Sequence, residues 1–233
     1  MNALLLTTSA LAQPLPDITG TYRMELLVVS HAHIPVFGEA YIDSTTTTIA
    51  TIESDGSGGY TQTHTTCSVV PVSTLKIIET IIPQTFVAQI TNNSYPLGIV
   101  AQDDGSWSFQ ADLGEQHIGY DPNLTDGTIP DNKDHPAITD WEDDGNPGAT
   151  INLKVPVFST VEVYLVQLAH THLNGTIDQD GNISGNLNII SFEQRSIGAR
   201  PPMFSANPRA TQIAEKSVFS YTRIPDGSTC ASL

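Results

Sequence analysis

Three clusters of turn-forming residues, each lying between two extended runs, constrain the fold of this chain most strongly. They occupy residues 54–59, 103–105 and 178–182 and consist mainly of Asp, Ser, Asn and Gly. Such residues favour tight turns, so each cluster predicts a β-hairpin made of the runs on either side. Short turns join antiparallel neighbours, whereas parallel strands need long crossovers, so the sequence favours an antiparallel sheet.

Alternating side chains between these turns predict long strands. In the run 20–33, Tyr22, Met24 and Leu26 fall on one face, because successive side chains of a strand point to opposite sides. Further strands are predicted at residues 37–53, 60–72, 75–82, 85–91, 99–101, 107–111, 149–158, 160–173, 183–192 and 217–224, and one helical turn at 210–216. We therefore predict an all-β fold, an antiparallel barrel or sandwich of about ten strands.

The first residues have features of a secretory signal peptide. A short apolar run precedes the small-residue site Ala10-Leu11-Ala12, which predicts cleavage after residue 12. A positive leading segment is lacking, because the first basic residue is Arg23, and this indicates a truncated start. We therefore predict a secreted, periplasmic or cell-surface protein whose single all-β domain spans residues 13–233.

Charge restricts the partners of this chain. Nine Lys and Arg residues against 25 Asp and Glu residues give a formal net charge of −16. Such a surface repels nucleic acid and favours cations or basic partners, so we predict no binding to nucleic acid. No apolar run approaches the roughly 18 to 20 residues of a membrane helix, so no transmembrane segment is predicted in the mature chain.

The two cysteines, Cys67 and Cys230, are compatible with one disulfide in an oxidising compartment. A bond between them would close most of the domain into one loop. The chain-entropy model then gives a stabilisation of roughly 5 kcal/mol.

A long polar segment separates the two halves of the chain. The predicted connection 114–149 is rich in acids, Gly, Pro and Asn, and inside it DWEDDGN at 140–146 resembles the calcium loops of EF-hand-like and thrombospondin-type repeats. The resemblance implies a calcium site with side-chain oxygens from Asp140, Glu142 and Asp144 and a backbone oxygen from Asn146. Position twelve holds Ile151, where an EF-hand has a bidentate glutamate; a solvated acidic loop is the alternative.

Two His-x-His motifs, His31 with His33 and His170 with His172, each lie at the end of an apolar strand-like run. Residues i and i+2 of a strand share a face, so each pair can clamp a transition metal such as zinc or copper. If the two strands are neighbours, four imidazoles can meet in one site. A metal enzyme would then have Glu25, Glu39 or Glu162 as general-base candidates, while the alternative is that the histidines face solvent.

Signatures of the common catalytic sites are absent from the sequence. It contains no serine-hydrolase elbow, no phosphate-binding lysine loop and no dinucleotide glycine fingerprint. We therefore predict a non-enzymatic, exported protein that binds a partner or assembles with itself, stabilised by calcium at its acidic loop. One alternative is a metal enzyme that uses the His-x-His strands. Another is a small-ligand carrier, because Gly20-Thr21-Tyr22 before a long strand resembles the lipocalins.

Overall fold

The computed structural model describes residues 15, 17–34, 38–90, 93–156, 158–205 and 209–233. The predicted signal peptide at residues 1–12 lies outside this part of the chain. Within the described part, no helix is long and apolar enough to cross a bilayer.

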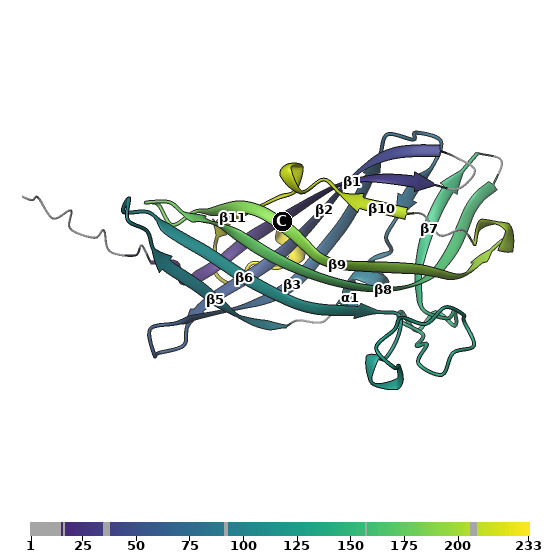
Figure 1. The fold of residues 1–233 in the computed structure, drawn as a ribbon, viewed down its shortest axis with the longest axis horizontal. Coiled ribbons are helices and arrows are strands. Elements are labelled where there is room, and N and C mark those ends of the chain that lie inside the picture. The colour runs from purple at the N-terminus through teal and green to yellow at the C-terminus, as the bar shows by residue number, and fades with distance from the viewer. Residues whose placement is uncertain (1–14, 16, 35–37, 91–92, 157, 206–208) are drawn as a thin grey trace, which may run out of the picture.

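Eleven antiparallel strands form one sheet, which confirms the predicted all-β fold (Figure 1). The strands are β1 (Gly20–Ile34), β2 (Gly38–Ser54), β3 (Tyr60–Ser73), β4 (Glu79–Ile81), β5 (Ser94–Ala101), β6 (Trp107–Ile118), β7 (Ala149–Val155), β8 (Phe158–Ile177), β9 (Ile183–Arg200), β10 (Arg209–Gln212) and β11 (Val218–Ile224).

The sheet closes on itself as an irregular barrel. Its strands follow the order β8-β6-β5-β3-β2-β1-β11-β9, and β9 pairs again with β8. The first part of β8 has β7 rather than β6 as its neighbour, and β4 adds to the outer edge of β7. Because of this change of neighbour, the sheet is wider at the end of the ring where β7 lies (Figure 1). The connection between β6 and β7 begins there and covers residues 119–148.

All three hairpins predicted from turn residues are present, as β2–β3, β5–β6 and β8–β9. Several local predictions are wrong. Of the predicted strand 75–82 only Glu79–Ile81 is a strand, and β6 extends to Ile118, so the connection predicted at 114–149 begins at residue 119. The predicted strand 85–91 contains the helix α1 (Gln84–Ala88), because a helical turn buries Phe86 and Val87 together on one side. The helical turn predicted at 210–216 is confined to the 3₁₀ turn Ala214–Lys216, because the preceding residues form β10 and pair with β1. Tertiary contacts outweigh local preference at α1 and at β10.

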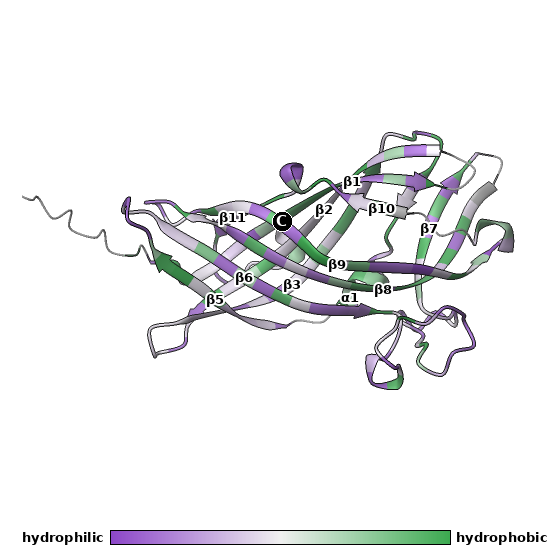
Figure 2. Ribbon diagram, viewed as in Figure 1, coloured by the Kyte–Doolittle hydropathy of each residue, from purple (hydrophilic) through white to green (hydrophobic). Residues whose placement is uncertain are grey.

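Apolar side chains fill the ring at the end where β5 and β11 lie. Apolar and polar residues alternate along β6 and β8, as Figure 2 shows, so each strand turns one face inward. Aromatic rings meet at the centre: Phe109 packs against Phe219 and Tyr221 with centroids 5.8 and 5.5 Å away. The other large, fully buried side chains of this core are Ile18, Tyr22, Met24, Ile52, Leu173, Ile183 and Leu187.

Buried polar groups lie beside this apolar core. The Tyr221 hydroxyl donates a hydrogen bond to Gln62 Oε1 at 2.8 Å, and burial raises the pKa of Tyr221. His64 is buried beside the Tyr95 ring, and its Nε2 has no hydrogen-bond partner. Burial lowers the pKa of His64 from its ordinary 6.5 to about 4. This histidine is therefore a neutral core group.

Acid is expected to destabilise the fold through His64. The pKa of His64 is lower in the folded chain than in the unfolded chain, so the unfolded chain takes up a proton first as the pH falls. The contribution of His64 to the free energy of unfolding is therefore fully present above pH 6.5. It is lost as the pH falls from 6.5 to 4, by up to about 3 kcal/mol.

Urea unfolding of the protein and of a His64→Gln variant between pH 8 and 4 measures this loss. The difference in unfolding free energy between the two proteins is expected to shrink as the pH falls. A matched Thr63→Gln change at the exposed neighbouring position, which removes no ionisable group, should leave the pH dependence unchanged. A constant difference for His64→Gln across this range would contradict the assignment.

Candidate metal centre

Asp112, His170 and His172 gather on the outer wall of the barrel. Ala111 on β6 pairs with Leu173 on β8, and both side chains are buried in the core. The next pair, Asp112 and His172, therefore points outward, and His170 follows two residues along on the same face. Two strands that are far apart in sequence thus contribute to one cluster.

The strand pairing is irregular on both sides of β8 next to this cluster. On the β6 side the register shifts between Asp112 and Glu115, where Gly114 adopts a positive φ of 65°. On the β9 side the register shifts between His170 and Thr171. Bulges bend a strand and change the direction of its side chains. The centroids of the two imidazoles, at positions i and i+2 of β8, lie 4.9 Å apart.

The geometry of the cluster suits a metal ion. Asp112 Oδ1 lies 2.7 Å from His170 Nε2, and Asp112 Oδ2 lies 3.3 Å from His172 Nε2. One ligand atom from each residue lies within 4.8 Å of the other two. The Gly114 backbone N–H donates to Asp112 at 2.8 Å, and this bond and His170 hold the pKa of Asp112 below its ordinary range. The carboxylate is therefore available as an anionic ligand.

The other His-x-His motif is built in the same way. Glu39 on β2 lies across from His33 on β1, and its two oxygens lie 3.2 Å from His31 Nε2 and 2.6 Å from His33 Nδ1. All three side chains are about half exposed. Among the described residues, however, only Asp112 with His170 and His172 forms a group of three whose ligand atoms are mutually close.

The two His-x-His motifs do not combine into a single site. Strands β11 and β9 separate β1 from β8 in the ring, and β10 pairs with β1 beside His31. Two of the predicted general bases have other partners: Glu25 pairs with Arg23, and Glu162 accepts a hydrogen bond from Tyr164 at 2.8 Å. The geometry therefore offers one three-residue cluster and, separate from it, a His-x-His pair beside Glu39.

Sequence reasoning identified both histidine pairs but missed Asp112. This residue is 58 positions before His170, and no spacing in the sequence connects the two. The available signal was Asp112-Leu113-Gly114, in which a glycine two residues after an acid interrupts a strand-like run. Such a glycine indicates a bulge, but it does not identify the strand that pairs there.

The acidic connection 119–148 is folded against the barrel. Tyr120 and Ile129 are buried together with side chains of β8 and β9. Trp141 donates from its indole nitrogen to the Phe86 carbonyl at 3.3 Å, and a bridge pairs Asp140 with Gly148. The segment is therefore an ordered part of the domain.

The four predicted calcium ligands differ in their surroundings. Asp140 accepts backbone N–H bonds from Asp144 at 2.9 Å and from Gly145 at 2.8 Å, one on each carboxylate oxygen. Asn146 donates through its backbone and its side chain to Asp144. Glu142 is buried, and burial together with nearby Asp144 and Asp140 raises its pKa to about 7. Of the three predicted carboxylate ligands, Glu142 is the one whose hydrogen bond comes from outside the turn, from the Thr150 backbone N–H.

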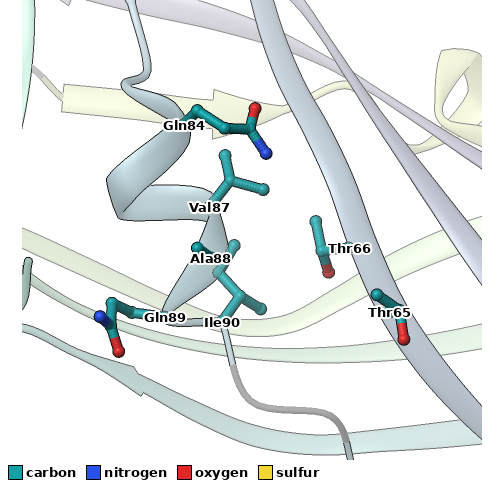
Figure 3. A pocket seen from close by; sticks show the side chains of 7 residues that line it. All are labelled: Thr65, Thr66, Gln84, Val87, Ala88, Gln89 and Ile90. Atoms are coloured by element: carbon teal, nitrogen blue, oxygen red, sulfur yellow. The ribbon is translucent and has the colours of Figure 1, made fainter. Parts of the chain in front are cut away.

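A pocket with a volume of about 500 Å³ opens between α1 and β3 (Figure 3). Its wall is neutral and combines hydroxyl, amide and aliphatic side chains: Thr65, Thr66, Gln84, Val87, Ala88, Gln89 and Ile90. Gln84 also donates to the carbonyl of Cys67, which forms the predicted disulfide with Cys230 at a Cα–Cα distance of 5.1 Å. The lining side chains that the described part of the chain supplies are all uncharged.

Comparison of the chain with protein-family models, with curated proteins and with solved structures finds no match. The class that the fold and the cluster define is therefore an all-β protein with a histidine-carboxylate cluster on its outer wall.

Proposed function

We propose that this is an exported, non-enzymatic all-β protein that binds a divalent transition metal, zinc or copper, at Asp112, His170 and His172. The proposal depends on one observation, the mutual approach of three ligand atoms within 4.8 Å. Two imidazoles and one carboxylate form a donor set that suits these ions. The disulfide is consistent with export, because such bonds persist in oxidising compartments.

The position of the cluster favours binding over catalysis. Its side chains are partly exposed on an outer strand surface, whereas catalytic metals act in shaped and largely dry cavities. The packed core at one end of the barrel also argues against the carrier alternative, because aromatic rings occupy the space that a lipocalin-like ligand would need. A protein partner or self-assembly stays a prediction.

Removing the two imidazoles is expected to abolish tight metal binding. After chelation and dialysis, zinc titrated into the protein in a calorimeter should bind at one strong site. In a His170→Ala/His172→Ala variant its affinity should fall by about 100-fold or more, because the remaining carboxylate is a weak single ligand. Asp112→Asn should lower the zinc affinity by at least the roughly 10-fold to 100-fold that is lost with a group that only orients a metal ligand, because Asp112 is itself a proposed ligand.

The matched control is a His31→Ala/His33→Ala variant, which removes the same two side chains from the other strand end. It should retain the strong site and lose only weaker binding. Equal zinc affinity in the protein and in the His170→Ala/His172→Ala variant, with unchanged circular dichroism, would refute the proposed function.

A further inference from the structure

Glu142 is an unusual residue in the acidic connection because it is buried. It is 8% exposed, whereas its neighbours Trp141 and Asp143 are more open to solvent. Its Oε1 accepts a hydrogen bond from the Thr150 backbone N–H at 2.8 Å, which links the connection to the second residue of β7. The carboxylate therefore lies where the connection meets the sheet.

The second oxygen of Glu142 is buried and accepts no hydrogen bond from the protein. The hydroxyl of Thr150 is likewise buried without a regular hydrogen bond, although it lies close enough to help lower the pKa of Asp144 against the effect of burial. A buried carboxylate oxygen without a partner is costly, so such groups are normally paired or bound to a cation. These two buried oxygens belong to residues that a hydrogen bond joins, and Asp144 lies two residues after Glu142 in the same loop.

Charge around Glu142 favours a cation over a protein donor. Asp144 and Asp140 lie close enough to Glu142 to raise its pKa. Among the described residues, none of these three acids forms an ion pair with a lysine, arginine or histidine. Carboxylate and hydroxyl oxygens without nitrogen or sulfur donors are the ligands of a hard cation.

We propose that calcium binds between Glu142 and Asp144, with the Thr150 hydroxyl as a neutral ligand, and fastens the connection 119–148 to β7. This ligand set differs from the one that the sequence predicted. Asp140 and Asp144 each accept one hydrogen bond on each oxygen, which leaves lone pairs on both carboxylates, but only Asp144 has Thr150 among its neighbours. Asp140 therefore shapes the turn, and Ile151 at position twelve leaves the EF-hand pattern incomplete. Thr150, directly before Ile151, takes part through the strand that follows the loop.

The test is thermal unfolding of the chelated protein at pH 8, where Glu142 is ionised, with increasing calcium. The midpoint is expected to rise by about 6 °C at a calcium concentration of about 100 times the Kd. In Glu142→Gln the rise should disappear. This variant should also melt at a higher temperature than the chelated protein, because the buried charge is gone.

The matched control is Asp134→Asn, which removes one negative charge from an exposed position of the same connection, away from Glu142 in the sequence. It should respond to calcium like the unchanged protein. The His170→Ala/His172→Ala variant should respond as well, so a failure of the transition-metal site is distinguishable from a failure of this one. An unchanged midpoint with millimolar calcium, or a full response in Glu142→Gln, would overturn the proposal.

Discussion

Replacing Cys67 and Cys230 together by serine is expected to lower the free energy of unfolding by about 5 kcal/mol. The two cysteines are 163 residues apart in the sequence, so their bond closes most of the chain into one loop. In the chain-entropy model, the loss of freedom in the unfolded chain grows with the logarithm of loop length.

Urea unfolding of the protein and of the double variant measures this loss. The double replacement is chosen because a single one leaves a free thiol. Reducing agent should shift the midpoint of the unchanged protein towards that of the variant and should leave the variant itself unaffected. A loss below about 1 kcal/mol would show that the unfolded chain is already compact without the bond.

Local consequences of the same replacement are expected around α1. Cys67 sits at a register shift of β3, and its carbonyl accepts the side-chain amide of Gln84 from α1 at 3.2 Å. Loss of the bond should therefore loosen one wall of the neutral pocket. Amide hydrogen exchange should rise first in α1 and in residues 65–67, before the hairpin β8–β9.

The hairpins were predictable from sequence because the information for a tight turn is local. Gly105 and Gly181, for example, lie at turns and have positive φ angles, which glycine adopts at little cost. Closure of the ring was not predictable in the same way. It depends on the pairing of β1 with β11, of β11 with β9 and of β6 with β8, and none of these three pairs is a hairpin.

The candidate metal centre was predicted in part for the same reason. The spacing of His170 and His172 on one strand is a local property, and the structure places their side chains together. The contribution of Asp112 depends on long-range pairing and on bulges, which alternation of side chains does not reveal. Likewise, the sequence placed Glu142 in the acidic loop, but its burial depends on how the loop meets β7.

Replacing Phe109 by alanine is expected to lower the free energy of unfolding by about 3 to 5 kcal/mol. The ring is fully buried and packs against Phe219 and Tyr221, so its removal leaves a cavity lined by aromatic side chains. Urea unfolding measures the loss. Phe192→Ala is the matched control, because that ring is 44% exposed on β9 and its removal should cost well under 1 kcal/mol.

The Phe109 result also separates a packed core from a ligand cavity. In a carrier, side chains that line the cavity contact ligand more than one another, so their truncation changes affinity more than stability. In this barrel the rings contact one another, and we expect the full cost of a core truncation in the protein alone. A loss below about 1 kcal/mol for Phe109→Ala would contradict the packed core and restore the carrier alternative.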